Sequence, residues 1–163
     1  MPSSKASKKQ KAKNPPPTAG DAPVFFFMPN EEWGEFCQWH RAVFTISKEE
    51  ISNLVGHVVD DEDPYGSVTF TCAEQFMIWD MVKSAVVEAG NVAKFGQNPH
   101  LARTLLSTGN RQLCEAASKD RVWGIGYTAK HAMAHQDDWG ENLLGKALMA
   151  ARERLRTDEG EAR

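Results

Sequence analysis

Residues 141–156, ENLLGKALMAARERLR, carry the clearest helical pattern in this chain. Their apolar side chains recur three and four positions apart, which places them on one face of a helix. These positions are Leu144, Leu148, Ala151 and Leu155. The arginines near the end of the stretch suit the negative end of the helix dipole. We therefore predict an amphipathic helix over residues 141–156, packed on the core through its leucine face.

Working outward from this helix, the sequence predicts further short helices and strands. Helices are expected in the segments that follow a capping residue and end near a glycine: 48–55, 73–90 and 99–108. Strands are expected in the short apolar or alternating runs: 24–28, 67–70 and 113–116. Because these elements do not alternate as regular βαβ units, we predict an α+β fold, a mostly helical single domain with a few short strands.

Two of these helices begin with the pattern of a capping box, a hydroxyl followed three residues later by an acid. Ser47 and Glu50 form the first pair, and Thr71 and Glu74 form the second. The pattern leaves Glu74 with two interpretations, a helix cap or a functional acid.

Composition excludes several classes of protein. The chain has 163 residues, of which 41% are hydrophobic and 25% charged, as in an ordinary single domain. No apolar run approaches the roughly 18 residues of a membrane span. Three cysteines without a C-x-x-C spacing argue against a disulfide scaffold or a zinc ribbon, so a reducing, intracellular and cytoplasmic setting is expected.

Charge is distributed unevenly along the chain. Residues 1–22 carry five lysines and one aspartate, whereas the remainder carries 14 basic and 21 acidic residues. We expect residues 1–22 to be a disordered basic tail, 23–156 the folded domain and 157–163 a disordered C-terminal tail. The lysine run is interpreted as a solubilising tail, with a nuclear localisation signal as the alternative. The acidic body is not a polycation built for nucleic-acid backbones.

Three charged residues lie among apolar neighbours and are candidates for chemistry: Glu74, Lys94 and Glu115. A buried carboxylate has a raised proton affinity and works as an acid or a base. The alternatives are that Glu74 only caps its helix and that Glu115 only pairs with an arginine such as Arg103. Lys94 is a candidate to bind phosphate or to form a Schiff base with an opened sugar, or else it is a surface lysine.

Tryptophans beside glycines mark two further candidate segments. Asp120 precedes Trp123 and Gly124, where glycine permits a sharp turn beside an aromatic face that can stack on a base. Residues 139–145 repeat this pattern with Trp139, Asn142 and Gly145, and Asn142 falls where a helix start favours phosphate. The alternative is that both tryptophans belong to the core and both glycine sets to turns.

Histidine spacing gives only weak evidence for a metal. His131 and His135 are four residues apart but lack the glutamate of the zinc-peptidase motif, so two surface histidines are the favoured interpretation. We predict neither a metal nor a cofactor.

An ordered set of segments, 34–39, 73–77, 93–98, 105–109, 113–116, 120–126 and 139–145, resembles the NADAR superfamily of YbiA-like N-glycosidases. The resemblance spans about residues 24–156, in family order. It implies an α+β fold and cleavage of the C–N bond between a ribose and a nitrogen base. The implied substrates are ADP-ribose attached to guanine, alone or on a nucleic acid, and ribosylamino-pyrimidine phosphates near riboflavin biosynthesis.

The resemblance also implies the site residues. The catalytic set is Glu74, Asp120 and Lys94. The substrate-binding set is Gln38, Trp39, Glu115, Trp123, Gly124, Trp139, Asn142 and Gly145. Which member performs which step is left open, with Glu74 or Asp120 as the carboxylate that stabilises positive charge and activates water.

Two positions depart from the family pattern. Cys37 stands where the family has serine. After Met77 a long internal family segment, with a lysine and an arginine, is missing before the stretch 79–83. The predicted function is N-glycosidase, and the alternative is a catalytically weakened binding module for ADP-ribose or a nucleotide.

Overall fold

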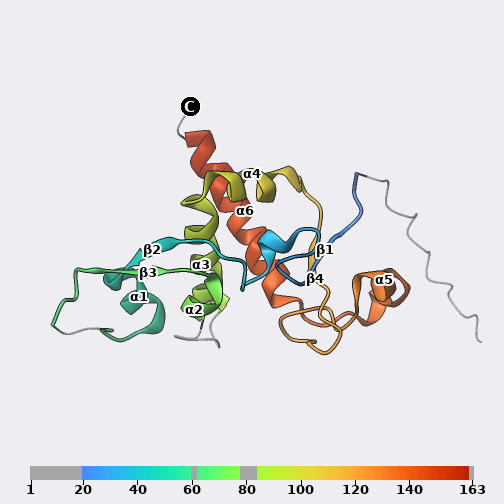
Figure 1. The fold of residues 1–163 in the computed structure, drawn as a ribbon, viewed down its shortest axis with the longest axis horizontal. Coiled ribbons are helices and arrows are strands. Elements are labelled where there is room, and N and C mark those ends of the chain that lie inside the picture. The colour runs from blue at the N-terminus through green and yellow to red at the C-terminus, as the bar shows by residue number, and fades with distance from the viewer. Residues whose placement is uncertain (1–19, 60–61, 78–83, 162–163) are drawn as a thin grey trace, which may run out of the picture.

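The computed structural model describes residues 20–59, 62–77 and 84–161 (Figure 1). Its elements, in chain order, are β1 (Val24–Phe26), the 3-10 helix η1 (Gly34–Phe36), β2 (Phe44–Ser47), α1 (Lys48–Val55), β3 (Ser67–Phe70), α2 (Ala73–Met77), α3 (Ser84–Gly96), α4 (Pro99–Ser107), β4 (Leu113–Glu115), α5 (Ala129–Ala132), the 3-10 helix η2 (Met133–Asp138) and α6 (Leu143–Glu161). Short strands among many helices confirm the predicted α+β class.

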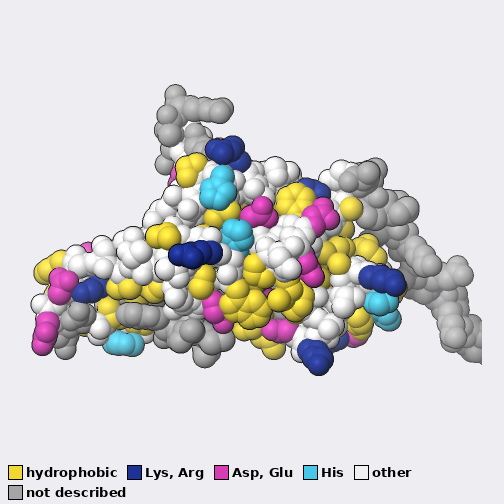
Figure 2. All heavy atoms as spheres, viewed as in Figure 1, with side chains coloured by type: hydrophobic (Ala, Val, Ile, Leu, Met, Phe, Trp, Pro, Cys, Tyr) yellow, Lys and Arg dark blue, Asp and Glu magenta, His cyan; other side chains and the backbone are white. Residues whose placement is uncertain are grey.

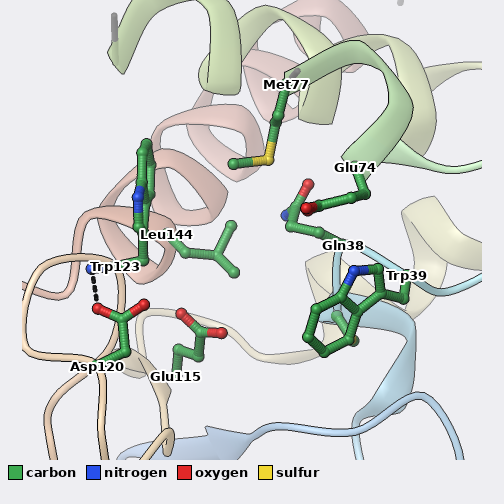
Figure 3. A pocket seen from close by; sticks show the side chains of 9 residues that line it. Gln38, Trp39, Glu74, Met77, Glu115, Asp120, Trp123 and Leu144 are labelled. Atoms are coloured by element: carbon green, nitrogen blue, oxygen red, sulfur yellow. Dashed lines mark hydrogen bonds between the residues drawn. The ribbon is translucent and has the colours of Figure 1, made fainter. Parts of the chain in front are cut away.

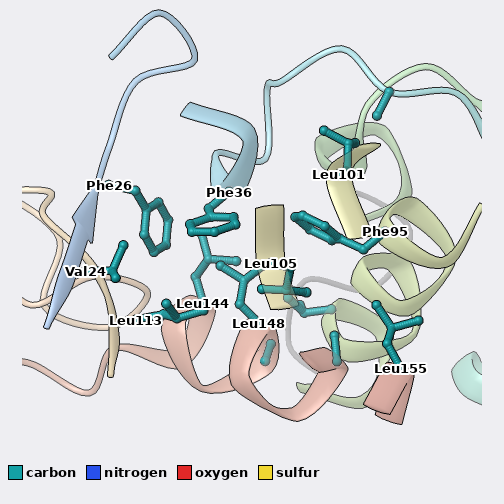
Figure 4. Packing of buried hydrophobic residues seen from close by; sticks show 14 of the residues in the cluster. Val24, Phe26, Phe36, Phe95, Leu101, Leu105, Leu113, Leu144, Leu148 and Leu155 are labelled. Atoms are coloured by element: carbon teal, nitrogen blue, oxygen red, sulfur yellow. The ribbon is translucent and has the colours of Figure 1, made fainter. Parts of the chain in front are cut away.

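The largest core cluster lies where α3, α4 and α6 meet β1 and β4 (Figure 4). Leu144, Leu148, Ala151 and Leu155 are all buried in or beside it, which confirms the predicted apolar face of the last helix. Each fully buried leucine contributes about 2 kcal/mol relative to an exposed one. This cluster fixes α6 against the strand that carries Glu115.

Two small sheets lie on either side of the long helices. Strand β1 pairs in parallel with β4, so that Phe26 lies opposite Glu115. Strand β2 pairs antiparallel with β3, and Phe44 and Phe70 stack there at 5.5 Å between ring centroids. Figure 1 shows β2, β3 and α1 on one side of α3 and α6, and β1 and β4 on the other.

Helix α1 begins and ends as predicted. The backbone N–H of Glu50 donates to Ser47 Oγ at 3.1 Å, which is the first half of a capping box. Gly56 ends the helix at a φ of 85°, a left-handed conformation that glycine adopts without a Cβ clash.

The predicted helix over 73–90 differs from the structure. Helix α2 covers Ala73–Met77, and α3 passes through Gly90 to Gly96, so Gly90 is no stop. A Cβ on Gly90 would lie 2.5 Å from Phe76 Cδ1, which shows that glycine here permits close packing of α2 on α3. The departure from the family pattern after Met77 falls at 78–83, outside the described residues.

The last helix also extends further than predicted. Helix α6 continues to Glu161 instead of ending at Arg156, so residues 157–161 are helical where a tail was expected. Arg156 pairs with Glu153 at 2.7 Å, and each added residue adds an intrahelical bond. The predicted basic tail, up to residue 19, lies outside the described residues. Within the described ranges, no helix is long and apolar enough to cross a membrane.

Candidate functional site

A cavity of about 160 Å³ brings together six of the predicted site residues (Figure 3). They come from the segment after η1, from α2, and from β4 with the loop that follows it: Gln38, Trp39, Glu74, Glu115, Asp120 and Trp123. Cys37, Met77 and Leu144 complete the lining. Such a volume is below that of drug-sized sites, so a larger ligand must extend beyond the cavity.

Glu74 lines the cavity because a different residue caps α2. Gln75 Oε1 accepts hydrogen bonds from the backbone N–H and the hydroxyl of Thr71, at 2.8 and 3.0 Å. The Glu74 backbone N–H donates to Gln38 O at 3.1 Å, which joins α2 to the opposite wall. The predicted pairing of Thr71 with Glu74 is therefore wrong, and the Glu74 side chain lines the cavity (Figure 3).

Glu115 is the most strongly perturbed acid of the cavity. Its pKa is raised to about 7, first because burial removes water from the carboxylate and then because Asp120 and Glu74 repel its negative charge. Its Oε2 atom is buried and has no hydrogen-bond partner within the described residues. Near neutral pH this carboxyl group is therefore divided between its protonated and ionised forms.

Asp120 shapes the loop that carries Trp123. Its Oδ1 atom accepts from the backbone N–H groups of Val122 and Trp123, at 2.9 and 2.8 Å. A Cβ on Gly124 would lie 2.9 Å from Glu115 O, so glycine lets this loop approach β4. The loop thus sets Asp120 and Trp123 beside Glu115.

Two tryptophans form facing walls of the cavity, Trp123 on one side and Trp39 on the other (Figure 3). Trp123 packs against the core, whereas Trp39 is 55% exposed. An aromatic face of this kind stacks on a planar base. In Figure 3, Asp120 and Glu115 lie below the cavity, and Glu74 lies beside Gln38, above Trp39.

A wider hollow of about 610 Å³ continues from the cavity and shares Trp39, Glu115 and Asp120 with it. Its other lining residues include Phe27 and Val122, both partly exposed. Figure 2 shows apolar surface beside acidic side chains on this face of the molecule. A ligand larger than one ring therefore has room to extend from the cavity.

Lys94 lies outside the cavity lining. It is fully buried, and its Nζ atom donates to Glu35 O at 2.8 Å and to Cys37 O at 2.9 Å. Burial lowers its pKa to about 8, against a smaller opposing effect of the nearby Cys37, Cys72 and Glu35. The surface-lysine alternative is therefore wrong: Lys94 ties down the segment that leads into Gln38 and Trp39.

Asn142 and Gly145 join β4 to the start of α6. Asn142 Nδ2 donates to Leu113 O at 2.8 Å, and its Oδ1 accepts from the Glu115 backbone N–H at 3.1 Å. A Cβ on Gly145 would collide with Leu113 O. These contacts occupy the Asn142 side chain, which is buried and does not line the cavity.

Trp139 likewise does not line the cavity. Its Nε1–H donates to Ala132 O at 2.8 Å, and its ring meets Phe25 edge-on at 5.8 Å.

The two histidines of the weak metal pattern contact neighbouring side chains. The Nδ1 atom of His131 lies 3.0 Å from Thr128 Oγ1, and the His135 ring stacks on Tyr127. In the described part of the chain, no three His, Cys, Asp or Glu residues are grouped to hold a metal ion.

Sequence reasoning missed one polar residue beside the cavity. Asn91 on α3 is fully buried, and its Oδ1 accepts from Gln38 Nε2 at 3.4 Å. An asparagine among the small and apolar residues of α3 is the signal that could have marked it.

Comparison with known proteins identifies a matching domain family and several relatives. The family model for the NADAR domain matches residues 77–156. An N-glycosidase of Acanthamoeba polyphaga mimivirus is 50% identical over 78 residues, which are 47% of this chain and 46% of that protein. A riboflavin biosynthesis protein of Vibrio vulnificus is 27% identical over 154 residues, which cover 83% of this chain and 39% of that protein.

The solution structure of Escherichia coli YbiA shares the fold, with a TM-score of 0.58 and 21% identity over 86% of this chain and 89% of that chain. In sequence, N-glycosidase YbiA of Escherichia coli is 36% identical over 77 residues, 47% of this chain and 42% of that protein. The chain thus spans less than half the length of these sequence relatives. Residues 77–156 thus match the NADAR domain, and the chain as a whole has the fold of YbiA.

Proposed function

We propose that this chain is an N-glycosidase that hydrolyses the C–N bond between a ribose and a nitrogen base. The observation that carries the proposal is the convergence of Glu74, Glu115 and Asp120 with two tryptophans in one cavity. Relatives that are named N-glycosidases support the same reaction.

The reaction passes through a sugar with oxocarbenium character, which negative charge stabilises. As the C–N bond breaks, its electron pair leaves with the base, and a proton must reach the base nitrogen. Glu115 is suited to donate that proton, because its pKa of about 7 keeps part of the population protonated at neutral pH. Water then adds to the sugar carbon and gives a proton to a carboxylate.

We assign that second role to Glu74, with Asp120 as a fixed negative charge beside the developing cation. Asp120 is held in place by two backbone N–H groups, so its charge needs little reorganisation. The Glu74 side chain lines the cavity and is not used for capping α2. Trp123 and Trp39 would hold the planar base between them.

Two substrate classes fit this site: ADP-ribose attached to guanine, free or on a nucleic acid, and ribosylamino-pyrimidine phosphates. Both combine a ribose, a planar base and a phosphate, and the wide hollow next to the cavity offers room for the remainder of either molecule. The Vibrio vulnificus relative, a riboflavin biosynthesis protein, supports the second class.

The second candidate function is a binding module for ADP-ribose or a nucleotide. It is favoured by the departure from the family pattern after Met77, where an internal family segment is missing. Calorimetry with ADP-ribose together with a base-release assay separates the two functions. Release of base selects the enzyme, and binding without release selects the module.

A further inference from the structure

The Gln38 side chain holds a buried acceptor without a partner in the wall of the cavity. Gln38 is 6% exposed and lines the cavity, yet its Oε1 atom has no hydrogen-bond partner within the described residues. A buried acceptor without a partner destabilises the folded state, because it has lost its hydrogen bonds to water. Its placement in a ligand-sized cavity therefore points to a donor supplied by the ligand.

Asn91 fixes which atom of the Gln38 amide faces the cavity. Asn91 Nδ2 donates to Val87 O at 2.9 Å in its own helix, so its Oδ1 atom is turned toward Gln38. That oxygen accepts from Gln38 Nε2 at 3.4 Å, which leaves Gln38 Oε1 as the free end of the amide. A flipped amide would place two oxygens against each other, so the relay from α3 makes Gln38 an acceptor.

The position of this acceptor selects one group of a riboside. Gln38 and Glu74 belong to the same side of the cavity, where the Glu74 backbone N–H donates to Gln38 O (Figure 3). If Glu74 acts at the anomeric carbon, as proposed above, the hydroxyl nearest to that carbon is the 2′-hydroxyl, and we take it as the donor for Gln38. A hydrogen bond to that hydroxyl strengthens as positive charge develops on the sugar.

We propose that Gln38, oriented by Asn91, accepts a hydrogen bond from the ribose 2′-hydroxyl and makes the site select ribosides over 2′-deoxyribosides. This inference rests on the proposed function for the identity of the sugar. Gln38 would touch the substrate, whereas Asn91 is a positioning residue. A site built to pair with a substrate hydroxyl strongly rejects the analogue that lacks it.

The test measures binding of ribose 5-phosphate and 2-deoxyribose 5-phosphate to the full chain by calorimetry, in parallel with base release from N-ribosyl substrates. Wild type should bind the ribose compound at least tenfold more tightly. Gln38→Met, similar in shape but without the acceptor, should bind both compounds equally. Asn91→Ala, which frees the amide to flip, should show a smaller preference than wild type.

Gln97→Met is the matched control, because Gln97 bonds to the Thr45 backbone, away from the cavity lining. It should keep the wild-type preference. The comparison of two sugars on wild type tests the proposal even where a variant does not fold.

Equal binding of the two sugars by wild type, or no binding of either, overturns the inference. A preference that survives Gln38→Met overturns it as well. Base release without sugar discrimination would leave the N-glycosidase proposal standing and remove this one. Discrimination between the two sugars without base release would leave the role of Gln38 standing and remove the N-glycosidase proposal.

Discussion

Gln75 Oε1 accepts hydrogen bonds from both the backbone N–H and the hydroxyl of Thr71, at 2.8 and 3.0 Å. Glu74, one residue earlier, lines the cavity instead. This separation of a capping residue from a cavity acid makes stability and activity separable by mutation.

Glu74→Gln should keep the fold and abolish base release. Loss of a carboxylate that acts in the transition state removes about two to four orders of magnitude in rate. The melting temperature should stay within about 2 °C of wild type, because the cap is made by Gln75. Rates come from a base-release assay and stability from circular dichroism.

The matched control is Gln75→Ala, which removes the cap and leaves Glu74 in place. It should destabilise the protein by about 1 kcal/mol while folded enzyme retains its turnover. Unchanged turnover in Glu74→Gln would show that this carboxylate takes no part in the reaction.

The raised pKa of Glu115 predicts a specific pH dependence of activity. A general acid works while protonated, so kcat should decline as pH rises through about 7, the raised pKa of Glu115. Glu115→Gln should lower kcat and flatten this limb of the profile. A wild-type rate that stays constant from pH 6 to about 9 would contradict the assignment.

The same group predicts how stability changes with pH. The folded pKa of Glu115 is raised from 4.5 to about 7, so the folded state binds its proton more tightly than the unfolded state. Its contribution to the free energy of unfolding is therefore complete below 4.5 and is lost as pH rises through about 7. Denaturant titrations at several pH values should show that the free energy of unfolding falls less over this range in Glu115→Gln than in wild type. The same pH dependence in both proteins would exclude the effect.

Lys94→Met should act mainly on stability. It removes two charge-assisted hydrogen bonds, to Glu35 O and Cys37 O, and leaves both carbonyl groups without that donor. We expect a loss of about 2–4 kcal/mol in the free energy of unfolding, measured by urea titration. A fully stable but inactive Lys94→Met would instead return Lys94 to the role of phosphate ligand or nucleophile.

Trp39→Ala should weaken substrate binding without unfolding the protein. Trp39 is 55% exposed, so its removal takes little from the core. Stacking on a base contributes about 1–3 kcal/mol, which predicts a KM increase of about 5-fold to 150-fold. Trp33→Ala is a control outside the cavity lining, where the ring stacks on Phe36 and should matter for stability alone. Equal KM values for Trp39→Ala and wild type would exclude stacking.

Local patterns predicted much of the fold. The spacing of Leu144 and Leu148 identified the buried face of α6, because residues four positions apart lie on the same face of a helix. The prediction of the second capping box was wrong by one residue. Helix α2 begins at Ala73, so Gln75 and not Glu74 occupies the third helical position, where the capping side chain reaches back.

Long-range contacts explain the remaining differences. Lys94 is buried because it meets carbonyl groups 59 and 57 positions earlier in the chain. The Asn142 side chain is used by Leu113 and Glu115, 29 and 27 positions earlier. None of these partners can be identified from the sequence next to Lys94 or Asn142. Six of the residues that the family resemblance implied line the cavity, whereas Lys94, Gly124, Trp139, Asn142 and Gly145 do not. Only the fold separates these two groups.

The central claim is that this cavity hydrolyses an N-glycosidic bond, and oxygen-18 water tests it most directly. Wild type is incubated in labelled water with ADP-ribosyl-guanine or with a ribosylamino-pyrimidine phosphate, and the products are analysed by mass spectrometry. The account predicts that at least one substrate class yields free base and a ribosyl product with the label at its anomeric carbon, and that Glu74→Gln yields neither. Intact substrates from both classes, together with measurable binding of ADP-ribose, would contradict it and identify a binding module.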